Sequence, residues 1–340
     1  MTAERVTASV CEDAVVCIVG SHRSGTSLIA QLLKQSGVYL GSEDKLLGSN
    51  VGNQDGHYEH FGFIELNDAL LKQLGGSWEF PPELQSGWER DDSLEPLRCQ
   101  ARDLLQSFSG KSPWGWKDPR TTLLLPFWRS LIPNLSFIIC IRSPLEVANS
   151  LRARNKMPLS RGGYLWERYL RASLADTEGC RRLVVFYDHF FKNPEREVAA
   201  LLDFCNLRPS GRTAAPAATI RGDLRHQRND IAALLTCDEI TIESKLLYLG
   251  LRGLEVCGDD WATHGSVSDK TLTELLRLLE TSAQHQLVAR LQSSLNRSES
   301  ELANLRKEIW LDAKSNHPWA YRVYRKLLRP FQLARLRSGR

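Results

Sequence analysis

Residues 20–27, with the sequence GSHRSGTS, constrain the fold of this chain more than any other segment. They follow an apolar run at 15–19 (VVCIV) and precede helical spacing of apolar residues from Leu28 to Leu33. In such a loop, backbone N–H groups and the helix N-terminus can hold an anion. Two glycines in a strand-to-helix turn can also serve geometry alone. The segment therefore predicts the start of an α/β domain and makes a phosphate-binding loop the hypothesis to test.

Two further apolar runs, 136–141 (SFIICI) and 183–187 (LVVFY), are each followed by a helical pattern. Three apolar strands that each lead into a helix predict an α/β fold of the P-loop type, with a central parallel sheet and helices on both faces. Helical spacing is also present at 61–74 and 94–108. Ligands in such sheets bind at the carboxyl ends of the strands, and the clusters around Arg23, Lys117 and Arg142 follow strands.

The loop departs from the ATP-binding pattern. A Walker A loop has a lysine after the second glycine, where this chain has Thr26, and its cation lies inside the loop at Arg23. The strand at 136–141 leads into Arg142, where a Walker B strand supplies a metal-binding aspartate. Arginine binds phosphate groups and not magnesium. These departures argue against a P-loop kinase that acts on a small hydroxyl compound. A non-catalytic assembly module with this fold is a further hypothesis.

Four stretches together resemble the PAPS-dependent sulfotransferases, most closely the bacterial branch with an HRSGTS loop. They are 22–27 (HRSGTS), 116–120 (WKDPR), 141–150 (IRSPLEVANS) and 187–197 (YDHFFKNPERE). The resemblance extends from Val15 to about Leu207. It implies an enzyme that transfers a sulfuryl group from 3′-phosphoadenosine 5′-phosphosulfate (PAPS) to an acceptor hydroxyl, with no metal.

The resemblance also implies roles for individual residues. The 3′-phosphate is expected at Arg142 and Ser150, and the adenine near Tyr187. The 5′-phosphosulfate is expected at Ser21, His22, Arg23, Ser24, Gly25, Thr26 and Ser27. PAPS needs two anion sites, and the planar fork of arginine suits both groups. Instead of binding the 3′-phosphate, Arg142 could form a surface ion pair with Glu146, four residues further along the chain.

Catalysis of sulfuryl transfer requires cations on the transferring group and a base for the acceptor hydroxyl. We assign the cations to Arg23 and Lys117 and the base to Glu59, because the bacterial branch has an aromatic-Glu pair in this segment. The other candidate carboxylates are Glu43, Asp44 and Asp118. His57 and His60 are possible acceptor contacts, and two histidines alone are too few to predict a zinc site.

The chain is expected to have three parts: the sulfotransferase domain at 1–265, a helical or short coiled-coil segment at 266–312, and a basic amphipathic tail at 313–340. The coiled-coil segment offers a possible homodimer contact. Residues 314–340 hold eight Lys/Arg and no acid, mixed with aromatic residues. Such a tail suits either an anionic membrane surface or a solvated helix.

In many relatives a loop closes over the 3′-phosphate. Residues 221–226 are the candidate for that loop in this chain.

The resemblance to the bacterial branch implies a carbohydrate acceptor, and the basic tail suggests a lipid-linked glycan. The tryptophans can stack on sugar rings, but most are expected in the core; they include Trp78, Trp88, Trp114, Trp116 and Trp128. No CxxC pair is present among the eight cysteines, and no signal peptide is recognisable. The sequence therefore predicts a cytoplasmic protein, with peripheral association at the inner membrane face as a further option. No nucleic-acid-binding motif is visible.

Overall fold

A computed structural model describes residues 15–48, 56–207, 214–220, 231–257 and 277, all within one compact unit, Met1–Leu279. The strands are β1 Val15–Val19, β2 Trp114–Lys117, β3 Ser136–Ile141 and β4 Arg182–Phe186. The helices are α1 Thr26–Gln35, α2 Phe61–Gln73, α3 Glu95–Gln106, α4 Leu125–Leu131, α5 Pro144–Asn155, α6 Leu159–Ala175, α7 His189–Lys192, α8 Pro194–Phe204, α9 Ala214–Ala218, α10 Ile231–Thr236 and α11 Ile242–Cys257. Short 3₁₀ turns occur at Glu43–Lys45, Trp88–Arg90, Asp92–Leu94 and Pro119–Leu123.

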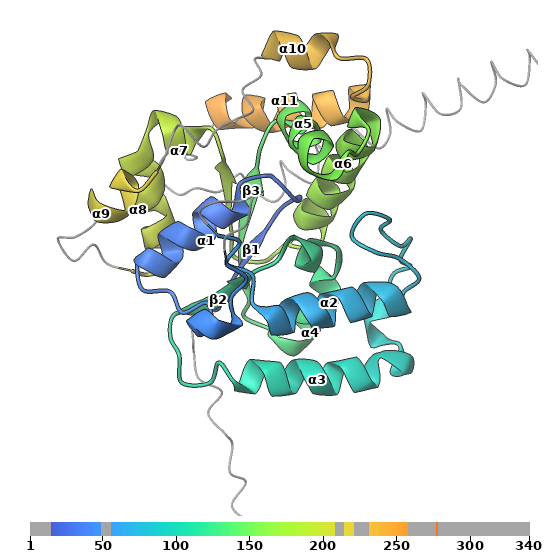
Figure 1. Cartoon of the computed structure of the whole chain (residues 1–340), viewed down its shortest axis with the longest axis vertical. Helices are drawn as coiled ribbons and strands as arrows, with labels where there is room; N and C mark the ends of the chain where they lie inside the picture. Colours follow the sequence, from blue (N-terminus) through green and yellow to red (C-terminus); the bar gives the residue numbers. More distant parts are fainter. Residues whose placement is uncertain (1–14, 49–55, 208–213, 221–230, 258–276, 278–340) are drawn as a thin grey trace, which may run out of the picture. The chain divides into compact units, whose positions relative to one another are not determined.

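The sheet has four parallel strands in the order β2-β1-β3-β4, which confirms the predicted fold class (Figure 1). The three apolar runs are strands, and β2 is the strand that we expected at the Lys117 cluster without giving its bounds. Its four residues, WGWK, lack an apolar run. The backbone at Gly115 approaches β1 so closely that a Cβ there would lie 2.1 Å from the carbonyl oxygen of Val16. Pairing with β1, and not local propensity, makes this segment a strand.

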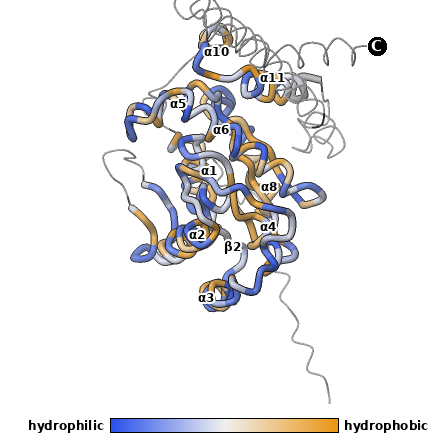
Figure 2. The backbone as a smooth tube through the Cα atoms, turned by 90° about the vertical axis from the view of Figure 1, so that its right-hand side faces the viewer, coloured by the Kyte–Doolittle hydropathy of each residue, from blue (hydrophilic) through white to orange (hydrophobic). Residues whose placement is uncertain are grey.

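Alternate residues of β1, β3 and β4 face two separate hydrophobic cores, as the period of two requires. On one face, Val15, Cys17 and Val19 of β1 pack with residues of α2, α3, α4 and α6. On the other face, Val16 and Ile18 pack with residues of α1 and α8. Figure 1 shows α1 and α8 on one side of the sheet and α2, α3 and α4 on the other. In Figure 2 the hydrophobic stretches of the chain lie toward the centre, beside α4 and α8.

All four strands end at one edge, because they are parallel. In the order β2-β1-β3-β4, the chain passes from β1 to one neighbour and later returns to the other side, so the connections diverge between β1 and β3. Ligands of open α/β sheets bind at such a position. The loop after β1 and Arg142 after β3 both lie there. The fold thus brings the predicted phosphate loop and the predicted 3′-phosphate residue to one edge.

Several predictions lie outside the described residues. These are the candidate closing loop at 221–226, the coiled-coil segment at 266–312, the basic tail at 313–340 and the domain boundaries between them. Within the described ranges, α6 and α11 are helices for which we made no sequence prediction. No helix in those ranges is long and apolar enough to cross a membrane.

Candidate active site

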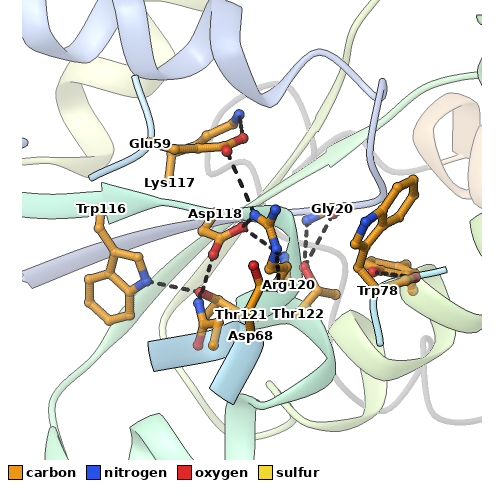
Figure 3. Close-up of polar contacts among 12 residues, drawn as sticks. Gly20, Glu59, Asp68, Trp78, Trp116, Lys117, Asp118, Arg120, Thr121 and Thr122 are labelled. Carbon is orange, nitrogen blue, oxygen red and sulfur yellow. Dashed lines mark hydrogen bonds and ion pairs between the residues drawn. The ribbon is translucent and has the colours of Figure 1, made fainter. Parts of the chain in front are cut away.

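The conformation of the loop after β1 depends on two glycines with positive φ and on hydrogen bonds to one threonine from the turn after β2. Gly20 has φ +144° and Gly25, the N-cap of α1, has φ +105°. Thr122 Oγ1 accepts a hydrogen bond from Gly20 N at 3.1 Å and donates one to Gly20 O at 3.2 Å (Figure 3). Thr26, at the position of the missing Walker lysine, begins α1 and is buried. The turn after β2 therefore anchors the start of the loop, from 102 residues away.

Two hydroxyl groups of this loop are buried without a hydrogen-bond partner among the described residues. They are Ser21 Oγ and Ser24 Oγ. A buried hydroxyl without a partner costs free energy, which an anion bound in the loop would recover. The loop also closely contacts Tyr187: a Cβ on Gly25 would lie 2.2 Å from Tyr187 Cδ2. The loop residues therefore fit an anionic ligand, and Tyr187 forms one of its walls.

Two arginines meet at this loop, and the charge of a third, Arg154, acts on them. Arg23, inside the loop, donates from Nε to Ser150 Oγ of α5 at 2.9 Å. Arg142 donates from Nη1 to the Arg23 carbonyl oxygen at 3.3 Å, and its guanidinium lies 4.6 Å from the centre of the Tyr187 ring. Burial, then the positive charges of Arg154 and Arg142, lower the pKa of Arg23 to about 10. An anion bound beside these charges would relieve that repulsion, so the cluster is suited to an anionic ligand.

Arg142 is tied to a carboxylate as well. Its Nε lies 2.7 Å from Glu146 Oε2, and the two side chains are 9% and 2% exposed. The pair we considered as a surface alternative is thus present, but it is buried. Pairing with Glu146 fixes the guanidinium at the N-terminus of α5, where it also faces Tyr187 and the loop.

Lys117 and Glu59 form a second buried ion pair. Lys117 Nζ donates to Glu59 Oε1 at 2.5 Å, and the side chains are 2% and 8% exposed. Lys117 pairs with Ile18 of β1, so its side chain points to the sheet face that α1 covers, toward which the loop after β1 also leads. Burial by itself raises the pKa of Glu59, but the Lys117 ammonium and the Arg120 guanidinium outweigh it and hold that pKa below its ordinary value.

A hydrogen-bonded network behind this pair positions Arg120 (Figure 3). Arg120 Nη1 lies 2.9 Å from Asp118 Oδ1 and 3.7 Å from Glu59 Oε2, and Arg120 Nε lies 2.7 Å from Asp68 Oδ1. Asn67 Nδ2 donates to Asp118 Oδ2 at 2.8 Å. Burial raises the pKa of Asp118 above its ordinary value, against the opposing effect of Arg120. Asp118 therefore acts as an internal anchor for Arg120.

His57 lies two residues before Glu59 and is 5% exposed. Its Nε2 is buried and has no hydrogen-bond partner in the described part of the chain. Burial, then the Lys117 ammonium, lowers the pKa of His57 to about 4, so the ring is neutral at neutral pH. On the loop itself, His22 contacts the Trp78 ring with centroids 4.4 Å apart. Neutral His57 thus offers an unused polar atom beside the Glu59–Lys117 pair.

A family model described as "Sulfotransferase family" matches residues 15–210, more than half of the 340-residue chain. The chain belongs to the sulfotransferase family. The match spans the loop, Glu59, Lys117, Arg142, Ser150 and Tyr187, so the residues that converge at the sheet edge are all inside it. No curated protein sequence matches the chain.

Solved structures of sulfotransferases also match this family member, at low identity. The sulfotransferase domain from the curacin biosynthetic pathway has 17% identity and a TM-score of 0.41, and the match covers 79% of this chain and 98% of that one. Sulfotransferase STF1 from Mycobacterium tuberculosis H37Rv has 15% identity and a TM-score of 0.43, with 69% and 77% covered. The sulfotransferase domain of the Synechococcus PCC 7002 olefin synthase has 18% identity and a TM-score of 0.40, with 80% and 94% covered.

The four carboxylates that the sequence offered as candidates for the general base differ in their surroundings in this sulfotransferase. Glu43 pairs with Lys34 and its side chain is 82% exposed, and Asp44 is exposed too. Asp118 is fully buried within its network. Of the four, Glu59 is the one in contact with Lys117. In the described ranges, no group of three or more His, Cys, Asp or Glu side chains is placed to hold a metal ion.

Arg120, Arg154 and Thr122 lie at or near the site and had no role predicted from the sequence. Arg120 lies within the WKDPR stretch, and Arg154 follows Ser150 by one helical turn on α5. That helical spacing is the signal that would have placed Arg154 near Ser150. Thr122 had no such signal, because its partner Gly20 is 102 residues distant.

Proposed function

We propose that this sulfotransferase transfers a sulfuryl group from PAPS to a carbohydrate hydroxyl. The observation that carries the proposal is the convergence of Arg23, Arg142 and Ser150 on a loop with unpartnered buried hydroxyls. The arrangement provides cations for anionic groups. The loop after β1 lacks the Walker lysine, and β3 is followed by Arg142 and not by a metal-binding aspartate. A donor with two separate anionic groups, as in PAPS, matches this set.

The proposed roles follow from position. Ser21, His22, Arg23, Ser24, Gly25, Thr26 and Ser27 hold the 5′-phosphosulfate. Arg142 and Ser150 hold the 3′-phosphate, and Tyr187 lies beside the adenine. The donor supplies a sulfuryl group attached to a good leaving group. Arg23 and Lys117 neutralise the charge of that group, and Glu59 accepts the proton of the acceptor hydroxyl.

The acceptor side is proposed from aromatic residues near the loop. Trp114, Trp116 and Trp128 are buried core residues, which removes them as sugar platforms. Trp78 instead contacts His22 of the loop, and its turn is fastened to α6 by a 3.1 Å hydrogen bond from Tyr169 Oη to the Trp78 carbonyl oxygen. The same turn carries Phe80, which is 65% exposed. The Phe80 ring is covered by the Arg161 guanidinium at 4.6 Å, whereas the Trp78 ring beside the loop suits the C–H face of a sugar ring.

Thermal unfolding tests the donor assignment. 3′-Phosphoadenosine 5′-phosphate (PAP), the donor without its sulfuryl group, is expected to raise the Tm of the full-length protein at concentrations well above its Kd, by mass action. ATP with magnesium is expected to leave the Tm unchanged. A shift with ATP and magnesium but not with PAP would favour the kinase alternative. No shift with either would favour a non-catalytic assembly module.

A screen of desulfated polysaccharides and lipid-linked oligosaccharides with labelled PAPS tests the acceptor. Transfer of label to a glycan is the expected result. Transfer only to non-carbohydrate hydroxyl compounds would refute the carbohydrate assignment and leave the donor assignment intact.

A further inference from the structure

The Glu59–Lys117 pair poses a chemical problem for the proposed base. A carboxylate that receives a 2.5 Å contact from a buried ammonium is stabilised as the anion and has little tendency to take up a proton. Arg120, at 3.7 Å from the second carboxylate oxygen, acts in the same direction. While Lys117 and Arg120 hold it in this way, Glu59 is an ionised but weak base.

Lys117 is placed to serve two partners. It ends β2 beside β1, on the sheet face from which the loop after β1 continues into α1. Its ammonium has three N–H donors, and a sulfonate held at that loop would offer it further oxygen acceptors. The proposed function already assigns Lys117 to the transferring group. The same ammonium is now held by the proposed base.

We propose that Lys117 is exchanged between the Glu59 carboxylate and the sulfonate oxygens of the donor, so that Glu59 becomes an effective base only when the donor is bound. This inference rests on the proposed function, since it needs an anionic sulfuryl donor at the loop. It adds a coupling between donor binding and proton transfer, through the contact between Lys117 and Glu59.

The bound donor changes the pKa of Glu59 through two effects, and both raise it. As Lys117 turns toward the sulfonate, Glu59 loses the contact of its main counter-ion in a buried place. The negative charge of the sulfonate, close to Lys117, also disfavours a second anion at Glu59. Each effect raises the proton affinity of the carboxylate. The direction of the change is therefore the same whether Lys117 leaves Glu59 or is shared.

The other charged groups around Glu59 do not cancel this change. Arg120 remains tied to Asp118 at 2.9 Å and to Asp68 at 2.7 Å, so it is not free to replace Lys117. The carboxylate of Asp118 repels a second negative charge. His57, from the segment of Glu59 itself, is neutral and adds no counter-charge.

The chemical step balances with these residues. The acceptor oxygen forms a bond to sulfur while the bond between sulfur and the phosphate oxygen breaks, and the bonding pair leaves with the nucleotide. The acceptor hydroxyl proton passes to a Glu59 carboxylate oxygen. Lys117 keeps its three protons throughout and contributes only its charge. Product release then allows Lys117 to return to Glu59, which loses its proton to water.

Carbon NMR of the full-length protein labelled at the glutamate carboxyl carbons measures the proposal directly. The Glu59 signal is identified by its loss in Glu59→Gln and is followed through pH titrations without ligand, with PAP and with PAPS. We expect PAPS to raise the pKa of Glu59 by about one unit or more, which is a tenfold gain in proton affinity. PAP, which lacks the sulfonate, should give a clearly smaller shift.

Variants provide the matched control. Lys117→Met should raise the pKa of Glu59 in the absence of ligand, and Lys117→Arg should not. Lys34→Met removes the lysine of an exposed pair with Glu43 and should leave the Glu59 titration unchanged. Should Lys117→Met not fold, the ligand titrations of the unsubstituted protein and of Lys117→Arg decide the question.

The outcomes separate the inference from the function on which it rests. Thermal stabilisation by PAPS with no change in the Glu59 titration would overturn the exchange and leave the proposed donor intact. Equal shifts with PAP and PAPS would also overturn it, because the sulfonate would then have no specific effect. Absence of any stabilisation by PAPS or PAP would overturn both.

Discussion

Gly25→Ala tests whether the loop after β1 and the Tyr187 ring form one packed unit. Gly25 has φ +105°, a conformation that L side chains rarely adopt, and a Cβ there would lie 2.2, 2.8 and 2.9 Å from three carbons of the Tyr187 ring. The ring cannot simply turn away, because the Arg142 guanidinium lies over it at 4.6 Å. The substitution therefore adds backbone strain and steric overlap at the same point.

The two costs can be estimated separately. A left-handed backbone with a Cβ costs roughly 1–2 kcal/mol, and added atoms in a packed region cost about 1–3 kcal/mol. Gly37 has a similar φ of +101° and has no atom within 4 Å of the added Cβ, so Gly37→Ala carries the backbone cost alone. We expect losses of roughly 1–2 kcal/mol for Gly37→Ala and roughly 2–5 kcal/mol for Gly25→Ala.

Urea unfolding of both variants measures these losses, and calorimetry with PAP measures donor binding. Gly25→Ala should also lose PAP affinity, whereas Gly37→Ala should keep it. In a Tyr187→Ala background, the cost of Gly25→Ala should fall to about that of Gly37→Ala, because the overlap is gone. Equal stability losses for the two single variants would refute the argument that Tyr187 packs on the loop.

Four further outcomes follow from the site and the sequence. Glu59→Gln should retain PAP affinity and lower steady-state turnover by on the order of 10²–10⁴. Arg142→Ala should weaken PAP binding about tenfold or more in calorimetry, and should also lower the Tm, because a buried carboxylate loses a cation. The depressed pKa of His57 means that the unfolded chain binds more protons between about pH 6.5 and 4, so stability should fall as pH falls through that window, and less so in His57→Gln. Deletion of residues 314–340 should reduce co-sedimentation with anionic vesicles at low salt and leave activity on a soluble glycan intact.

Specific results would contradict each of these. Near-normal turnover of Glu59→Gln, with collapse in Asp118→Asn or Glu43→Gln, would move the base elsewhere. An unchanged PAP dissociation constant in Arg142→Ala would remove the 3′-phosphate assignment. An acid stability profile unaltered by His57→Gln would mean that other groups cause the slope. Equal sedimentation of full-length and truncated protein would end the membrane hypothesis.

The fold class and the sulfotransferase family could be predicted from the sequence, whereas the phosphate loop and the kind of ligand stay predictions. These depend on local information: apolar runs of strand length mark β1, β3 and β4, and glycines between a strand and a helix mark the loop. The charge at a position is also local, so the sequence is sufficient to propose Arg23, Lys117 and Arg142 as anion-binding residues. Arg23 and Arg142, predicted to bind anions, and the absence of a Walker lysine already argued against ATP as the ligand.

Which of these groups touch depends on tertiary structure. Gly20 meets Thr122 across 102 residues, Arg23 meets Ser150 across 127, and Glu59 meets Lys117 across 58. Parallel strands are joined by long crossovers, so residues that follow adjacent strands are distant in the sequence, and side-chain partners depend on strand order and on packing of the helices. For the same reason, the sequence proposed Glu59 as a base and Lys117 as a cation but did not show that the two neutralise each other.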